Sequence, residues 1–281
     1  MANTKTFYAK ALAAAVLIAL PLASDAAGLR FASPDTAPPA CDHSAIQLGP
    51  ALAPFAVLAA TTITNAGNSV VSSTNARDSN SLMGVWPGSS ITGFYPPGLD
   101  SGGRNDIYSA TFNTNSGVPM AAQGRLTTVY NDIAALAPTA LVSGDLSQVE
   151  VPGYPKGTLP PGIYKSASTL SITAGNLHLV RGKNLASPAE YVFEVGTSLT
   201  TTADAGQAGN VILGRGVDAC NVYWQLGDSA VLGGASFSGS VFAYSSITVA
   251  GSTIYGRALA LHGAVTMTAG GGTQIKNPGG R

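Results

Sequence analysis

Residues 241–270 read VFAYSSITVAGSTIYGRALALHGAVTMTAG, and one pattern occurs twice within them. An apolar run (VFAY, then ALALHG) is followed a few residues later by an alternating run (ITVAG, then VTMTAG). Another copy begins at Val222, so the copies that start at residues 222, 241 and 258 lie 19 and then 17 residues apart. This period is too short for a helical repeat. It predicts one coil of a β-solenoid, with three short strands joined by Gly, Ser and Asn corners.

Earlier copies of the pattern occupy residues 55–67, 163–175 and 192–202. In the second strand of each coil apolar and hydroxyl-bearing residues alternate, and successive side chains of a strand point to opposite faces. We expect the apolar set to point into the solenoid, namely Ile63, Ile172, Leu199, Leu232, Val249 and Met267. The outward set comprises Thr62, Thr64, Ser171, Thr173, Thr200, Thr202, Thr248, Thr266 and Thr268.

The first strand of each coil is apolar on both faces, so its outward side must be covered. A helix predicted over residues 119–137, before Pro138, is the best covering element. Its apolar stripe consists of Leu126, Val129, Tyr130, Ile133 and Leu136. Residues 72–117 are rich in Gly, Ser, Asn and Pro, and we expect them to form an irregular cap that protects the strand edges at one end of the solenoid.

Composition limits the partners of the chain. Its 281 residues allow one large domain or two small ones, and 45% of them are apolar, which is enough to build a core. Charged residues make up only 10% of the chain, and the 14 acidic residues balance the 14 basic ones. This balance argues against nucleic acid and anionic membranes as partners.

The N-terminus is typical of a secretory signal peptide over residues 1–26. Lys5 and Lys10 precede an apolar stretch at residues 11–22 that is too short to span a bilayer, and the small residues around Ala26 suit cleavage after it. A core helix is the alternative. We expect a protein that is secreted or periplasmic and does not insert into a membrane, with an N-terminal arm at residues 27–45 and a tail at residues 277–281.

Two cysteines remain after the signal peptide, Cys41 and Cys220. Export permits a disulfide, which would tie the arm to the solenoid. The alternative is a buried thiol at Cys220, because residues 219–222 enter a strand.

A further set of short motifs lies at residues 48–49, 55–59, 62–65, 85–88, 91–94, 96–98, 126–132, 144–146, 161–164, 219–227 and 256–260. Through these motifs the chain resembles the microbial ice-binding protein family, from about residue 46 to residue 276. It implies a right-handed, triangular, parallel β-solenoid that is discontinuous in sequence, with one long helix packed alongside and an irregular cap insertion. It also implies that the N-terminal strands join the solenoid beside the late coils. Residues 73–82 and 153–159 depart from the family pattern without interrupting the coils.

The family resemblance implies ice binding, and the nine outward Thr and Ser positions suit it. Thr is β-branched and stiff, and none of the nine residues is charged. The family's Thr-Ala/Gly-x-Thr/Asn pattern is matched at residues 173–176 and in part at residues 268–271, whereas Val231, Gly233 and Ala250 interrupt the series. Thr and Ser also suit exposed strands without any such function. The third strand of each coil, for example residues 252–254, is the other candidate face.

No catalytic group of residues stands out, and we do not expect an enzyme. The three glutamates, Glu150, Glu190 and Glu194, do not repeat along a face, and the three histidines, His43, His178 and His262, lack the spacing of metal ligands. We expect no cofactor, no metal, and a monomer. The alternative function is a secreted surface or matrix adhesion module that binds carbohydrate or cells.

Overall fold

The computed structural model describes residues 46–67, 69–74, 81–94, 113–114, 117–182, 189–202, 208–268 and 272–278. The predicted signal peptide and the whole N-terminal arm, with Cys41 and His43, lie outside the described residues.

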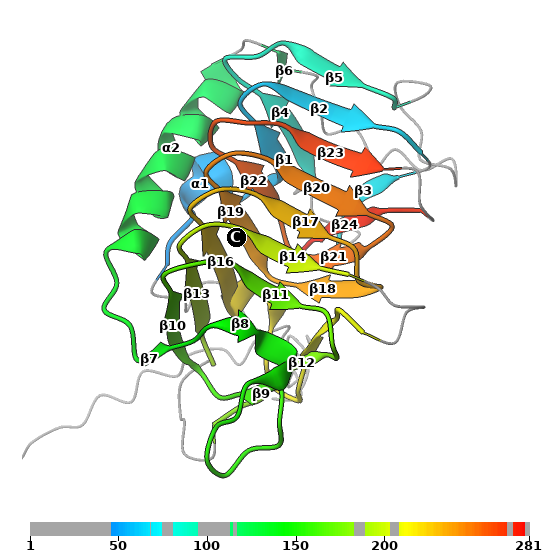
Figure 1. Cartoon of the computed structure of the whole chain (residues 1–281). Helices are drawn as coiled ribbons and strands as arrows, with labels where there is room; N and C mark the ends of the chain where they lie inside the picture. The colour runs from blue at the N-terminus through cyan, green and yellow to red at the C-terminus, as the bar shows by residue number, and fades with distance from the viewer. Residues whose placement is uncertain are drawn as a thin grey trace, which may run out of the picture. The chain divides into compact units, whose positions relative to one another are not determined.

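The chain coils into a solenoid whose strands pair in parallel with the strands of neighbouring coils (Figure 1). One side is a nine-stranded sheet with the order β6 (Asn113–Thr114), β4 (Leu82–Val85), β1 (Phe55–Ala59), β22 (Ala258–Ala260), β19 (Ser240–Ala243), β16 (Val222–Leu226), β13 (Tyr191–Val195), β10 (Gly162–Ser166) and β7 (Ala140–Leu141). The second side, which we call the threonine sheet, has the order β5 (Ser90–Thr92), β2 (Thr62–Asn65), β23 (Val265–Thr268), β20 (Ile247–Ala250), β17 (Ala230–Leu232), β14 (Leu199–Thr201), β11 (Leu170–Ile172) and β8 (Gly144–Asp145).

The third side is built from two shorter sheets. One has the order β15 (Val211–Leu213), β12 (Leu177–Leu179) and β9 (Thr158–Leu159), and the other has the order β18 (Ser236–Ser238), β21 (Thr253–Tyr255), β24 (Gln274–Asn277) and β3 (Val70–Ser73). The helical elements are α1 (Gly49–Leu52), α2 (Gly117–Ala134), η3 (Leu146–Gln148) and η4 (Ala219–Asn221). The predicted parallel β-solenoid with one long helix alongside is confirmed.

The helix α2 covers the outward face of the nine-stranded sheet (Figure 1). Strands β1, β13 and β16 are buried along their whole length, because one face packs into the solenoid and the other packs against α2. The predicted stripe on the helix makes this contact, with Leu126, Val129, Tyr130 and Ile133 buried and Leu136 packed against the same cluster. The helix begins two residues before the predicted start and ends at Ala134, where the amide of Leu136 turns back to the carbonyl of Ile133.

Inside the solenoid, equivalent side chains of successive coils stack. Tyr164, Phe193 and Trp224 occupy matching register positions in β10, β13 and β16. The rings of Phe193 and Trp224 lie 3.9 Å apart at 8°, and the Trp224 indole nitrogen donates to the carbonyl of Ser238. Gly239 is required beside this stack, because its φ is +116° and a Cβ there would lie 2.8 Å from the Trp224 nitrogen. The ring stack therefore leaves no room for a side chain at position 239, where the chain turns.

The N-terminal strands are inserted beside the late coils, as the resemblance implies. Val57 of β1 pairs with Ala258 of β22, and Ile63 of β2 pairs with Val265 of β23. On the third side β3 pairs with β24. Residues distant in the chain thus complete each side of the solenoid.

The segment that was expected to form an irregular cap, residues 72–117, also contains regular strands in its described part. Strands β4 and β5 lie within this range and extend two sides of the solenoid, since β4 pairs with β1 and β5 pairs with β2. The segment is rich in turn-forming residues, but it forms strands here because the edges of β1 and β2 offer unpaired backbone groups. Residues 75–80, 95–112 and 115–116 lie outside the described part of the chain.

The inward orientation of the alternating strands is testable with two matched leucines. Leu232 of β17 is fully buried, whereas Leu141 of β7 is 80% exposed. We expect Leu232→Ala to lower the free energy of unfolding by about 2–5 kcal/mol because it leaves a cavity in the core. Leu141→Ala should change it by less than about 0.5 kcal/mol. Denaturant unfolding measures both, and equal effects of the two substitutions would contradict the inward assignment.

Candidate functional site: the threonine sheet

All nine residues that were predicted to face outward do so. Thr202 is exposed and the other eight are partly exposed, whereas the six predicted inward residues are buried. The sheet stands open at the front of Figure 1, and α2 lies on a different side. Its outward side chains are therefore available to solvent.

The strand register aligns one outward position of every coil into a column that crosses the sheet. From β5 to β8 this central column reads Thr92, Thr64, Thr266, Thr248, Val231, Thr200, Ser171 and Asp145. Its first four members are threonines in four adjacent strands. Sequence reasoning missed Thr92, because it lies in the segment that was expected to be irregular.

Further hydroxyls flank the central column. Thr62 pairs with Ser90 on one side of it, and Thr268 pairs with Ala250 on the other. Ser198, Ser229 and Ser246, each partly exposed, directly precede inward residues and so share the outward face. These serines were not among the nine predicted outward residues. The alternation, extended by one position, could have found them.

Asp145 in β8 is the last residue of the central column, and its carboxylate accepts hydrogen bonds from nearby donors. Its Oδ1 accepts from the amide and hydroxyl of Ser147 at 2.9 and 2.7 Å, and its Oδ2 accepts from the Thr173 hydroxyl at 2.7 Å and from the Thr173 and Ala174 amides at 3.1 and 2.9 Å. Burial raises the pKa of this carboxyl, but the hydrogen bonds from Ser147, Thr173 and Ala174 outweigh it and lower the pKa to about 2. Asp145 is therefore ionised at neutral pH, and the Thr173 hydroxyl already has a partner.

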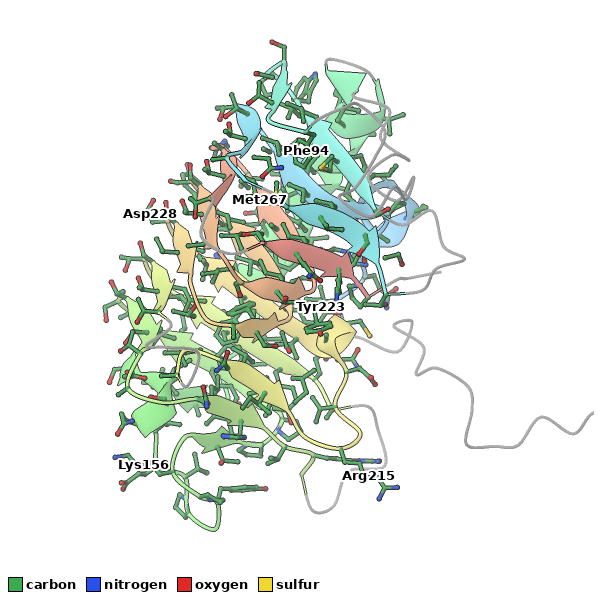
Figure 2. All side chains as sticks on the ribbon, turned by 90° about the vertical axis from the view of Figure 1, so that its right-hand side faces the viewer. Phe94, Lys156, Arg215, Tyr223, Asp228 and Met267 are labelled. Atoms are coloured by element: carbon green, nitrogen blue, oxygen red, sulfur yellow. The ribbon has the colours of Figure 1, made fainter. Side chains whose placement is uncertain are left out.

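A second carboxylate, Asp228, lies at the corner before β17, and Figure 2 shows it at the outer margin of the molecule. Ser198 and Ser229 donate their hydroxyls to it at 3.3 and 3.2 Å. Hydrogen bonds from Ser245 and Ser229 lower the pKa of Asp228. The carboxylate of Asp228 thus orients the hydroxyls of Ser198 and Ser229, which flank the central column.

The other sides of the solenoid have different chemistry. On the third side Tyr255 is exposed, with the Lys276 ammonium 5.3 Å from its ring centre, and Thr253 is only partly exposed. Ser252, from the other candidate face, is fully buried. Of the sides that the structure describes, the threonine sheet alone presents an extended series of uncharged hydroxyls.

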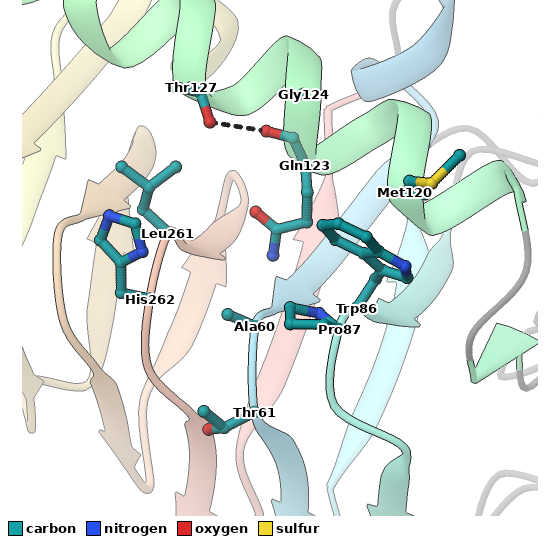
Figure 3. Close-up of a pocket in the computed structure, with 10 residues that line it drawn as sticks. All are labelled: Ala60, Thr61, Trp86, Pro87, Met120, Gln123, Gly124, Thr127, Leu261 and His262. Atoms are coloured by element: carbon teal, nitrogen blue, oxygen red, sulfur yellow. Dashed lines mark hydrogen bonds between the residues drawn. The ribbon is translucent and has the colours of Figure 1, made fainter.

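An open groove of about 450 Å³ lies beside α2 (Figure 3). It is lined by Ala60, Thr61, Trp86, Pro87, Met120, Gln123, Gly124, Thr127, Leu261 and His262. None of these residues carries a carboxylate, so the groove offers no acid–base pair for hydrolysis. Within the described ranges no three His, Cys, Asp or Glu residues gather into a potential metal site, and no helix there is long and apolar enough to cross a membrane.

Comparison with known proteins identifies the family of this chain. A family model described as Ice-binding-like matches residues 57–271. The chain belongs to the ice-binding-like family. It is 39% identical over 217 residues to an ice-binding protein of Nostoc sp. (strain HG1), which covers 76% of this chain and 68% of the relative.

Solved structures of ice-binding proteins share the fold. One from an Antarctic biological consortium has 35% identity and a TM-score of 0.63, covering 81% of this chain and 89% of its own. Another, from the Antarctic ascomycete Antarctomyces psychrotrophicus, has 30% identity and a TM-score of 0.62. The match covers 82% of this chain and 97% of the solved chain. The ice-binding-like fold therefore extends over the described solenoid.

The hydrogen bonds of Asp145 predict a pH dependence of stability. The folded-state pKa of about 2 lies below the usual value of about 3.9, so ionised Asp145 stabilises the fold above pH ~4. This stabilisation is lost as the pH falls toward 2. Asp145→Asn should lower the thermal midpoint at pH 7, because an amide NH₂ would face the donors of Ser147 or Thr173.

The midpoint difference from wild type should shrink between pH 4 and pH 2, as measured by circular dichroism melts. Asp132→Asn, on the exposed side of α2, is the control and should leave the midpoint nearly unchanged at every pH. A difference that stayed constant with pH would show that Asp145 acts through shape rather than charge.

Proposed function

We propose that the protein binds ice through the threonine sheet. The observation that carries the proposal is the central column, in which Thr92, Thr64, Thr266 and Thr248 stand in register on four adjacent strands. The strands that carry them, SIT, TITN, VTMT and ITVA, contain no charged residue. Membership of the ice-binding-like family supports the same function.

The physical argument starts from spacing. Neighbouring strands lie ~4.8 Å apart, and outward residues i and i+2 of one strand lie roughly 6.7 Å apart, so the sheet holds hydroxyls and methyls on a two-dimensional grid. Thr has a restricted χ1, so little rotamer entropy is lost when the surface orders water. The hydroxyl bonds water, and the methyl restrains neighbouring waters without gathering them around a charge. The grid can hold a layer of water that merges with an ice crystal.

This role requires no catalytic residues, cofactor or metal, and we propose a protein that is not an enzyme. Because ice forms outside cells, export through the predicted signal peptide fits the function. A monomer suffices, since one threonine sheet already offers the whole surface.

Replacing Thr266 with Tyr tests the proposal. The larger ring would stand above the plane at the middle of the four-threonine run and hold ice away from its neighbours. We expect Thr266→Tyr to reduce thermal hysteresis and incorporation into growing ice by roughly tenfold or more, as for a central residue of an interface. Both can be measured at a fixed concentration of folded protein.

The matched control is Thr253→Tyr, which places the same ring on the third side of the solenoid. This variant should keep wild-type ice binding and a wild-type circular dichroism spectrum. If Thr253→Tyr abolished ice binding and Thr266→Tyr kept it, the ice-binding site would lie on the third side of the solenoid.

We also propose the disulfide between Cys41 and Cys220 for the exported protein. Cys220 is buried, with its sulfur 3.9 Å from the Asn221 side-chain oxygen, and Cys41 lies outside the described residues. Mass mapping of a non-reduced digest should find the two cysteine peptides joined. Alkylation of Cys220 by iodoacetamide in the unreduced, denatured protein would rule the disulfide out.

A further inference from the structure

The threonine sheet is not uniform along the solenoid. Its central column runs through four threonines and is then broken at Val231, which is 43% exposed and has no hydroxyl. The flanking column is interrupted nearby, at Ala250 in β20 and at Gly233 after β17, and it resumes with Thr202 and Thr173. The hydroxyl series is therefore interrupted at β17, with hydroxyl-bearing residues on both sides of the break.

Charge divides the sheet at the same place. Asp145 stands in the central column directly beside Ser171, and Asp228 holds the hydroxyl of Ser198, two residues before Thr200. Thr200 and Ser171 thus lie between two carboxylates. Strands β5, β2, β23 and β20 carry no charged residue, although Asp228 also bonds Ser245 at the corner leading into β20. Thr248 therefore lies at the boundary between the two parts.

Beyond β20, several hydroxyls that flank the central column are already occupied by carboxylates. Thr173, Ser198 and Ser229 already donate to carboxylates. Within the described ranges the column hydroxyls of Thr64, Thr266, Thr248, Thr200 and Ser171 donate to no protein group, so in the column it is the nearby carboxylates that distinguish the two parts.

An ionised carboxylate orients the first shell of water toward itself. Waters held in this way cannot also adopt the tetrahedral positions of an ice lattice, so charge and ice compete for the same layer. We infer that ice contact is confined to the end of the sheet formed by β5, β2, β23 and β20, through Thr92, Thr64, Thr266 and Thr248 with Ser90, Thr62 and Thr268 beside them. The end formed by β14, β11 and β8 stays conventionally hydrated. This inference rests on the proposed function and narrows its site.

The test compares the same substitution at two positions of one column. Thr266→Tyr lies within the proposed contact area, and Thr200→Tyr lies outside it, separated by Thr248 and Val231. Each protein is measured for thermal hysteresis and for partition into growing ice, with folding checked by circular dichroism and thermal melting. We expect a loss of roughly tenfold or more for Thr266→Tyr and less than twofold for Thr200→Tyr.

The outcomes separate the inference from the proposed function. If both variants lose ice binding, the whole sheet contacts ice, so the inference fails while the proposed function stands. If neither loses it, the threonine sheet is not the site and both fail. Loss with Thr200→Tyr alone would place contact at the opposite end and overturn the inference. If a Tyr variant does not fold, Thr266→Lys and Thr200→Lys give the same comparison through charge rather than bulk.

Discussion

The structure depends on the parallel, in-register stacking of coils. Each strand hydrogen-bonds to the equivalent strand of the next coil, so a residue type at one register position repeats along the solenoid. Because side chains alternate, a register slip of one residue would turn the threonines inward and the core residues outward. The stack of Tyr164, Phe193 and Trp224 inside and the run of Thr64, Thr266 and Thr248 outside are consequences of the same register.

The three sides of the solenoid differ in what covers them. The helix α2 buries the apolar outer face of the nine-stranded sheet, and the third side carries Tyr255 and Lys276. The threonine sheet remains open and, along most of its strands, uncharged. Its carboxylates, Asp145 and Asp228, lie at the end of the column and at a corner, where they orient hydroxyls of nearby coils. The chemistry of the open side thus follows from where the fold places its few charges.

Much of the fold and the orientation of the candidate site follow from local patterns. The alternation of apolar and hydroxyl residues assigned the nine predicted outward residues and the six predicted inward residues correctly, because the direction of a side chain depends only on its own strand. Proline and glycine content, by contrast, concealed β5 and with it Thr92, since a short strand can form in such a segment once a neighbouring edge offers a partner. The pairing of β1 with β22 and the hydrogen bonds of Asp145 to Thr173 join residues distant in sequence. No local sequence pattern predicts these contacts. Only the family resemblance indicated that the N-terminal strands pair with the late coils.

The central claim is that an uncharged, register-aligned lattice of hydroxyls orders water into ice. Thermal hysteresis of the purified wild-type protein, combined with an assay of ice recrystallisation, tests it most directly. The account predicts a measurable hysteresis gap, faceted crystals and suppressed recrystallisation at concentrations where an ordinary folded protein has no effect. A folded protein that growing ice excludes, with crystals that grow as round discs, would contradict it.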